Sequence, residues 1–269
     1  MNIENMNCKI CNAPSKEIFT AKILSKYDAK YFQCTKCKFI QTEHPYWLDE
    51  AYNSAITHLD LGLIFRNNAF KYIVFNLINI YFDKKGKFID YGGGYGMFVR
   101  LERDLGLDFY RQDKYCENLF AKYFDIEDLP RNTKFEILTT FEVFEHLQDP
   151  IIEIEKMLTL SDNILFSTEL QPRDIENLNP SNWHYILPEI GQHIALYSIE
   201  SLQYIAKKYN LNLYSSNSIH LLTKKKLSST FFRLNTNFKL SRALTQIIPK
   251  NTLIMRDFSF IKEKLGVKP

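Results

Sequence analysis

The spacing of apolar and polar positions divides most of the chain into segments typical of helices or of strands. Apolar residues recur at helical intervals in segments 61–83, 97–105, 150–160 and 198–209. Short β-branched and aromatic runs predict strands at 87–91, 109–112, 135–139 and 163–167, with a closing pair at 211–215 and 218–222. Ser198 has a side chain suited to a helix N-cap. Because strands and helices alternate, we expect an α/β fold whose mostly parallel sheet has helices on both faces.

The chain falls into three zones of different composition. Residues 1–45 hold closely spaced cysteines, residues 46–223 carry the alternating helices and strands, and residues 224–269 are basic, amphipathic and predicted to be helical. From His220 onward, eleven basic side chains oppose two acidic ones, a net +9, although the whole chain carries only +3. This imbalance is typical either of a tail that contacts an anionic surface or of a solvated helical face.

The bulk composition fits a globular protein that keeps its thiols reduced. The chain has 269 residues, of which 45% are hydrophobic and 24% charged, as is ordinary for a globular protein. Its longest apolar stretch, Tyr72 to Phe82, is interrupted by Asn76 and Asn79 and is too short to span a bilayer. No secretory signal is visible. We therefore expect a cytoplasmic protein, in which cysteines serve metal ligation rather than disulfides.

Two CxxC pairs in the first zone indicate a metal site. Cys8 and Cys11 form one pair, and Cys34 and Cys37 form the other. Each pair presents two sulfur atoms from one tight turn, and two such turns complete the tetrahedral thiolate shell that structural Zn²⁺ prefers. We therefore predict a zinc ribbon over residues 1–45, because so short a segment could hardly bury a core without metal. Cys116 stands apart and is interpreted as an ordinary helix residue.

A glycine-rich run lies at a predicted strand-to-helix junction. Asp90, Gly92, Gly94 and Gly96 form the pattern DxGxGxG, and the dinucleotide pattern GxGxxG fits poorly. Glycines at such a turn let a ligand approach the backbone N–H groups of a helix N-terminus. Asp113 follows the next predicted strand, where an acidic residue can bind ribose hydroxyls.

Two later segments extend this pattern into a family resemblance. Asp125 opens a D-x-x-D-L-P segment, and Glu142 opens Glu-Val-Phe-Glu-His, which ends at His146. With the glycine loop and Asp113, these segments resemble the ordered motifs of class I S-adenosylmethionine-dependent methyltransferases. The resemblance implies a Rossmann-like, seven-stranded sheet and an S-adenosylmethionine site formed by those residues, with Asp125 reading the adenine. Arg66 is either a ligand for the methionine carboxylate or an ordinary surface arginine.

The loop after the fifth strand carries the candidate acceptor chemistry. It includes Gln192 and His193 and resembles the acceptor loop of bacterial sugar methyltransferases, including zinc-binding deoxysugar C-methyltransferases. The resemblance implies that His193 is a general base, although a hydrogen-bonded loop histidine would look the same in sequence. Gln192 replaces a glutamate, and since glutamine cannot take a proton, O-methylation is favoured over C-methylation. His146 is the second candidate base. Weaker pocket candidates precede the long helix: Tyr46, Tyr52, Asn53 and Ser54.

Three functions compete on this pattern. The leading hypothesis is methylation of a nucleotide-activated sugar or phosphorylated glycan precursor, for example in capsule or lipopolysaccharide biosynthesis. An RNA methyltransferase with a zinc module is the second hypothesis; the ribbon is not strongly basic and no separate RNA-binding module is visible, so a nucleic-acid partner is disfavoured. The third is a non-catalytic zinc-ribbon interaction protein, against which the intact glycine loop and Asp113 argue.

Overall fold

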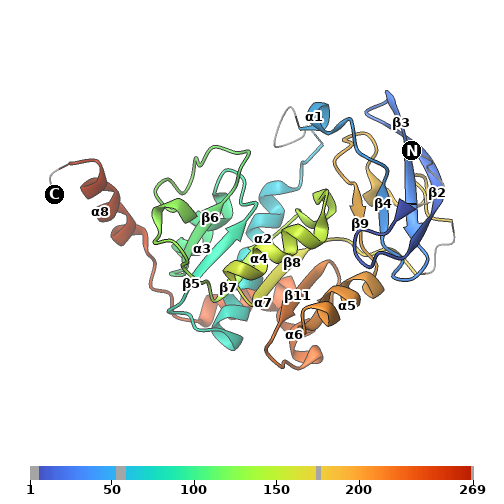
Figure 1. Ribbon diagram of the computed structural model, residues 1–269. Helices are drawn as coiled ribbons and strands as arrows, with labels where there is room; N and C mark the ends of the chain where they lie inside the picture. The colour runs from blue at the N-terminus through green and yellow to red at the C-terminus, as the bar shows by residue number, and fades with distance from the viewer. Residues whose placement is uncertain (1–5, 53–58, 174–176, 268–269) are drawn as a thin grey trace. The chain divides into compact units, whose positions relative to one another are not determined.

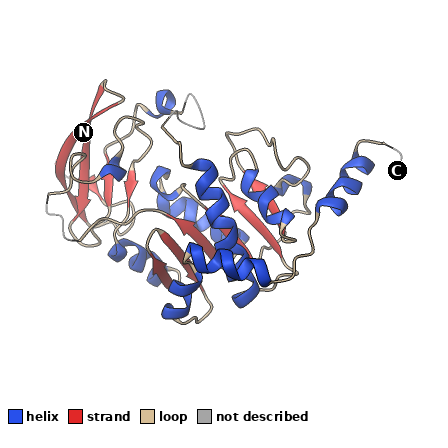
Figure 2. Cartoon of the chain, turned by 180° about the vertical axis from the view of Figure 1, so that it is seen from behind, coloured by secondary structure: helices blue, strands red, loops and turns tan. Residues whose placement is uncertain are grey.

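The computed structural model describes residues 6–52, 59–173 and 177–267 of the chain. It consists of two compact units (Figure 1). Unit 1 comprises the chain up to Asp60 together with Phe141–Lys156 and Phe166–Lys226, and unit 2 comprises Leu61–Thr140, Met157–Leu165 and Leu227–Pro269. Figure 2 shows the strands of both units in red. Among the described residues, no helix combines the length and the apolar character needed to cross a membrane.

Unit 2 is built on parallel strands. Strand β5 (Lys87–Tyr91) pairs in parallel with β6 (Asp108–Gln112) on one side and with β7 (Ile137–Thr140) on the other. Most side chains of these three strands are buried. The rings of Phe88 and Phe109 stack with their centroids 5.1 Å apart. Helix α3 (Met97–Asp104) returns the chain from β5 to β6 and contacts both strands. The predicted parallel β-α-β arrangement is therefore confirmed.

The full sheet is mixed and has six strands among the described residues. Its order is β10-β11-β8-β7-β5-β6. β8 (Asn163–Ser167) belongs to unit 2 at its start and to unit 1 at its end, and β10 (Asn212–Ser216) with β11 (Ile219–Thr223) is the predicted antiparallel closing pair. The described residues do not include the seventh strand that the resemblance implied. Next to β6, a single parallel bridge joins Arg111 to Asp125, and the short helix η2 (Ile126–Asp128) follows at once.

The long predicted helix in unit 2 packs against the basic C-terminal segment. Helix α2 (Leu63–Tyr81) contacts α6 (Ser229–Asn235) and α7 (Phe238–Ile247). Asn76, which interrupts the apolar stretch, is fully buried, and its amide donates to the Ser241 carbonyl at 2.7 Å. The polar interruption is thus the site where α2 recognises α7, because a buried amide must find hydrogen-bond partners.

An ion-pair network fixes the last helix, α8 (Ile254–Lys264), to α3. Asp257 is 3% exposed in its side chain and accepts two hydrogen bonds from the guanidinium of Arg103, which is 1% exposed. Arg100 reaches the same carboxylate at 2.9 Å. Arg256 bonds Asp108 at 2.8 Å. Part of the basic charge of the C-terminal segment is therefore neutralised within unit 2.

Unit 1 contains a five-stranded sheet that combines distant parts of the chain. Its order is β1-β2-β3-β4-β9, from the strands Met6–Asn7, Pro14–Ile23, Tyr27–Cys34, Ile40–Thr42 and Ala195–Leu196. The hydrophobic core of this unit joins side chains of β2, β3 and β4 to Trp47 and to residues of the segment 178–196. Its helices are α1 (Leu48–Ala51), most of α4 (Pro150–Leu160) and α5 (Ile199–Lys208), which begins at the predicted N-cap Ser198.

We predict that Asp257→Ala lowers the free energy of unfolding of unit 2 by about 3 kcal/mol, because it leaves the buried Arg103 guanidinium without its main counter-ion. Urea unfolding followed by circular dichroism measures this change. Glu263→Ala removes an exposed acid from the same helix and is the matched control, for which we expect less than about 0.5 kcal/mol. Equal losses in the two variants would contradict a structural role for the Asp257–Arg103 pair.

Candidate functional site

The glycine-rich loop of unit 2 adopts the backbone that its sequence predicts. Gly92, Gly94 and Gly96 have φ angles of 71°, 53° and 84°, in the left-handed region that favours glycine. A Cβ atom at Gly96 would lie 2.7 Å from Asn118 Oδ1, whereas one at Gly94 would meet no described atom within 4 Å. Gly96 is therefore required by close packing, and Gly94 faces open space at the N-terminus of α3, where a ligand can reach backbone N–H groups.

Asp90 is buried at the end of β5, below the glycine loop. The Thr139 hydroxyl on β7 donates to Asp90 Oδ1 at 2.7 Å. Burial raises the pKa of Asp90 to about 7, although this hydrogen bond opposes the shift. Near neutral pH the side chain is therefore poised between its neutral and charged forms, and an electropositive ligand at the loop would favour the charged one.

Asp113 lies directly after β6, as the sequence predicted, and its carboxylate organises the neighbouring loops. Oδ2 accepts from the N–H of Gly94 at 2.9 Å, and Oδ1 accepts from the N–H groups of Tyr115 and Cys116 at 2.7 and 2.8 Å. A carboxylate has about four lone-pair positions, so these bonds leave acceptor capacity. Asp113 is thus held rigidly beside the glycine loop, in a position suited to binding ribose hydroxyls.

Asp125 is held by an arginine that sequence reasoning did not single out. Arg111, on β6, donates to Asp125 Oδ1 at 2.6 Å and to the carbonyl groups of Gly94 and Cys116 at 2.5 and 2.9 Å. Asn118 donates to the other Asp125 oxygen at 2.8 Å. The available signal was an arginine in a strand of a predicted buried sheet. The proposed contact of Asp125 with adenine stays a prediction, as does the role of Arg66, which lies in the first turn of α2.

In unit 1, the Glu-Val-Phe-Glu-His segment forms a turn with unusual backbone geometry. Glu142 has a φ of 55°, a left-handed conformation that costs a non-glycine residue about 1–2 kcal/mol. Its N–H donates to Ser167 Oγ at 2.8 Å, and the Ser167 hydroxyl donates back to Glu142 Oε1 at 2.6 Å. Such strain clusters at functional sites. The reciprocal bonds with β8 hold this carboxylate in place.

The same turn brings His146 to His193, the two candidate bases. Their rings lie 5.1 Å apart, edge to face. Backbone bonds fix the approach: the N–H of Ile194 donates to the Glu145 carbonyl at 2.9 Å, and His146 Nδ1 lies 3.0 Å from the Gln192 carbonyl. His193 Nδ1 lies 2.5 Å from the Tyr185 carbonyl. The structure thus places both histidines in one cluster, which their separation in sequence did not reveal.

Glu145 completes this cluster and was not singled out from the sequence. Its side chain is 1% exposed and lies 4.0 Å from His146 Nε2. Burial raises the pKa of Glu145 to about 8, with a further contribution from the negative charge of Glu142. Burial likewise lowers the pKa of His146 to about 4. His146 is therefore a neutral imidazole at neutral pH, able to accept a proton or to ligate a cation.

The remaining acceptor-side candidates support the loop. The Gln192 side chain donates to the Ala51 carbonyl at 2.7 Å, and the Trp47 indole donates to the Gly191 carbonyl at 2.8 Å. The ring of Tyr52 lies 6.2 Å from that of His146, and the Tyr46 hydroxyl donates to the Asp28 carbonyl. Asn53 and Ser54 lie outside the described residues.

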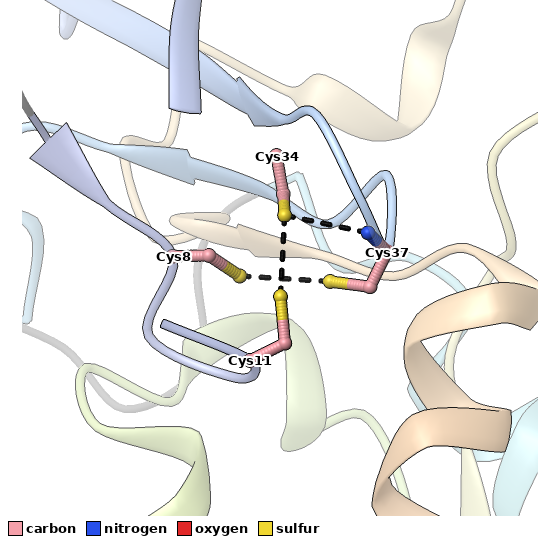
Figure 3. Close-up of side chains that lie close together, drawn as sticks. All are labelled: Cys8, Cys11, Cys34 and Cys37. Atoms are coloured by element: carbon pink, nitrogen blue, oxygen red, sulfur yellow. Dashed lines mark hydrogen bonds between the residues drawn. The ribbon is translucent and has the colours of Figure 1, made fainter. Parts of the chain in front are cut away.

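Four cysteine sulfur atoms gather at a second site in unit 1. Figure 3 shows the side chains of Cys8, Cys11, Cys34 and Cys37 directed toward a common centre. The Sγ atoms of Cys8 and Cys37 lie 3.5 Å apart, and those of Cys11 and Cys34 lie 3.3 Å apart. Tetrahedral Zn²⁺ with bonds of about 2.3 Å would separate its sulfur ligands by roughly 3.8 Å. The arrangement can therefore hold a tetrahedral metal ion after a small expansion.

The local backbone explains how each CxxC pair presents its sulfur atoms. Asn12 and Lys38, the residues after each pair, have φ angles of 59° and 61°, which turn the chain sharply. N–H groups also point at sulfur: those of Lys36 and Cys37 lie 3.4 and 3.3 Å from Cys34 Sγ. These contacts fix the position of the Cys34 sulfur atom. The second turn is also tied to α5, because the Ser198 hydroxyl donates to the Cys37 carbonyl.

Unit 2 therefore presents the features of a nucleotide-cofactor domain: a parallel sheet, a glycine-rich turn at a helix N-terminus and an acid after the second strand. The family model described as a methyltransferase domain matches residues 65–216. The chain belongs to this family and is an S-adenosylmethionine-dependent methyltransferase.

Comparisons with solved structures find distant likenesses. The plantazolicin methyltransferase BpumL in complex with SAH has a TM-score of 0.43 and 16% identity over 69% of this chain and 81% of its own. The mitomycin 7-O-methyltransferase MmcR has a TM-score of 0.39 and 13% identity over 67% of this chain and 68% of its own. An O-methyltransferase family 2 protein from Planctomyces limnophilus in complex with apigenin has a TM-score of 0.42 and 13% identity over 68% of this chain and 62% of its own. No curated protein matches the sequence. We take nothing about the acceptor from likenesses this distant.

We predict that Asp90→Asn changes how stability depends on pH. The pKa of Asp90 is about 7 in the folded chain, against 3.8 ordinarily. Below about pH 4 the group is protonated in both states, and as pH rises toward 7 only the unfolded chain loses the proton, so the wild type loses stability. The variant lacks this loss, and its advantage should grow by up to about 4 kcal/mol between pH 4 and 7.

Urea unfolding at a series of pH values measures this difference. Glu263→Gln, which removes an exposed carboxyl, is the control and should follow the wild type. A constant difference between Asp90→Asn and wild type across this range would show that Asp90 is ionised in the folded protein throughout.

Proposed function

We propose that this methyltransferase acts on a hydroxyl group of a sugar or phosphorylated glycan precursor. The observation that carries the proposal is the union of the histidine loop with the cysteine-bearing sheet. β9, which follows His193, pairs with β4 through Ile40 with Leu196 and Gln41 with Ala195. The two features on which the resemblance to zinc-containing sugar methyltransferases rests thus belong to one structural unit.

The cofactor-binding residues act through binding and orientation. S-adenosylmethionine supplies a methyl group that its sulfonium already activates. The open backbone at Gly94 and the N-terminal turn of α3 would hold the methionine portion, and Asp113 would take the ribose hydroxyls. Asp90, Asp125, Arg66 and Glu142 complete the proposed set. Because Arg111 ties the Gly94 carbonyl to Asp125, it would act as a positioning residue for both.

The acceptor side must align an oxygen for in-line attack and remove its proton. His193 is the proposed base, with His146 as the alternative. A carbonyl oxygen can only accept a hydrogen bond, so the contact of His193 Nδ1 with the Tyr185 carbonyl places the proton on Nδ1. The lone pair then resides on Nε2. This tautomer would leave Nε2 as the atom that takes the acceptor's proton, in keeping with the proposed role of His193.

The cysteine site would hold structural zinc in a cytoplasmic protein. Its four sulfur donors leave no ligand position for a substrate, which is typical of structural rather than catalytic zinc. In this proposal the metal stabilises the sheet on which the histidine loop is built. The basic C-terminal segment offers a further, peripheral contact to an anionic surface.

Methyl transfer to a panel of nucleotide-activated and phosphorylated sugars, with radiolabelled S-adenosylmethionine, tests the acceptor class. We expect label in at least one sugar and none in ribosomal RNA. In the same assay, His193→Gln should lower kcat by about 10²-fold or more, as expected for loss of a general base, and leave cofactor affinity by calorimetry within about threefold. Label in RNA alone would overturn the sugar proposal. Equal losses of turnover and cofactor affinity would show that His193 is not the base.

Removing the metal should loosen the histidine loop. We expect about one zinc ion per chain by elemental analysis and its loss in Cys34→Ser. Because β4 and β9 share one sheet and one core, amide hydrogen exchange of residues 192–197 should then rise at least about tenfold. Cys116→Ser, which alters the thiol outside the cluster, should retain zinc, and its amide exchange should stay as slow as in the wild type. Unchanged exchange after zinc loss would separate the metal from the loop.

A further inference from the structure

The turn and the histidine loop of unit 1 assemble a second set of metal-ligating side chains. One carboxylate oxygen of Glu145 and one nitrogen each of His146 and His193 all lie within 4.8 Å of one another. Glu145 and His193 are buried, and the His146 side chain is 21% exposed. One carboxylate with two imidazoles is a donor set that proteins use for divalent transition metals.

Backbone carbonyl groups orient both imidazoles for this role. His146 Nδ1 lies 3.0 Å from the Gln192 carbonyl, and His193 Nδ1 lies 2.5 Å from the Tyr185 carbonyl. Since carbonyl oxygens only accept, each Nδ1 carries the proton and each Nε2 carries the lone pair. A histidine that ligates a metal ion characteristically donates its other N–H to a carbonyl or carboxylate. Both histidines show this arrangement.

The Glu145 carboxyl group also has few partners among the described residues. Neither carboxylate oxygen of Glu145 has a hydrogen-bond partner among the described residues, although the hydroxyl groups of Tyr185 and Thr168 favour its charged form. Glu142 adds a second carboxylate close enough to repel it. Among the described ion pairs, Glu145 meets only His146. The charged form of a buried carboxyl group must be paired or coordinate a metal, and a bound divalent cation would provide that partner.

We propose that Glu145, His146 and His193 form a binding site for a divalent transition-metal ion, separate from the four-cysteine site. Bonds of about 2.1 Å would place neighbouring ligand atoms roughly 3–3.5 Å apart, so the side chains would move inward by about an ångström. Mn²⁺, Fe²⁺ and Co²⁺ suit these nitrogen and oxygen donors. Glu142 is an additional carboxylate, whose charge acts on Glu145.

The site would also change the role of the histidines. Its catalytic consequence rests on the methyl transfer proposed above, whereas cation binding itself does not. Three protein ligands leave coordination positions for an acceptor oxygen. With both Nε2 lone pairs coordinated, the cation rather than a free imidazole would lower the pKa of an acceptor hydroxyl. Its proton would pass to solvent, and the oxygen would then form the bond to the methyl carbon as the carbon–sulfur bond breaks.

Mn²⁺ is the probe that separates this site from the cysteine site, because thiolates select other metals. The full-length protein, with its cysteine site loaded with zinc, is titrated with Mn²⁺ in the absence of cofactor and acceptor. The electron paramagnetic resonance signal of free Mn²⁺ measures binding. We expect one saturable Mn²⁺ per chain and a rise in Tm.

Variants of the ligands decide the assignment. His146→Gln, at the partly exposed position, should weaken Mn²⁺ binding at least tenfold and abolish the rise in Tm, and Glu145→Gln provides a second test. His184→Gln is the matched control, since the His184 side chain is 82% exposed in the same unit, and it should bind as wild type. Absence of saturable binding by the wild type, or undiminished binding by folded His146→Gln, would overturn the proposal. Cofactor binding and label transfer are measured separately, so a failure here leaves the methyltransferase assignment intact.

Discussion

The shared hydrophobic core around Trp47 is the constraint on which unit 1 depends. The apolar side chains of β2, β3 and β4 are buried together with those of the histidine loop, which has little regular structure of its own. Trp47 lies between the two parts and is 1% exposed, and its indole N–H donates to the Gly191 carbonyl. Residues of the strands and of the histidine loop fill one core around it. The four-cysteine cluster and the segment that carries His193 are therefore joined through one hydrophobic core and one sheet.

In each unit, several charged or titratable side chains of the candidate sites are positioned by backbone groups. Asp113 accepts from three backbone N–H groups, and Arg111 donates to two backbone carbonyl groups as well as to Asp125. The two clustered histidines are oriented by carbonyl groups in the same way. Backbone partners are a durable choice, because substitution of the residue that bears them leaves the hydrogen bond available. The arrangement of the cofactor loop and of the histidine cluster is thereby tied to the fold itself.

Much of the fold followed from local signals, and most of the unpredicted features depend on pairing between distant residues. Strand β5, helix α4 and the Ser198 cap were predicted because their periodicity and end signals lie within a few residues. The glycine loop and the cysteine pairs carry their chemistry in short spacings. Glu145 and His146 join His193 only when the short helix η3 (Phe144–His146) meets β9, which is two residues long and has no periodic signal. After the bridge beside β6, the chain enters η2 through a capping box, in which the Asp128 side chain accepts from the Asp125 N–H.

The pairing of β4 with β9 also bears on how the protein is made. β4 leaves the ribosome before its partner strand. Leu196 of β9 emerges only after the glycine loop, β7 and β8 have been synthesised. Until then β4 has an open edge, and open edges are the parts of nascent sheets that pair with the wrong chain. All four cysteines are synthesised before β4, so the cluster could bind a metal ion while the edge of β4 is still unpaired. A contiguous segment from β1 to β4 would lack the strand that completes this sheet, because β9 lies within residues 65–216, the part of the chain that matches the methyltransferase family.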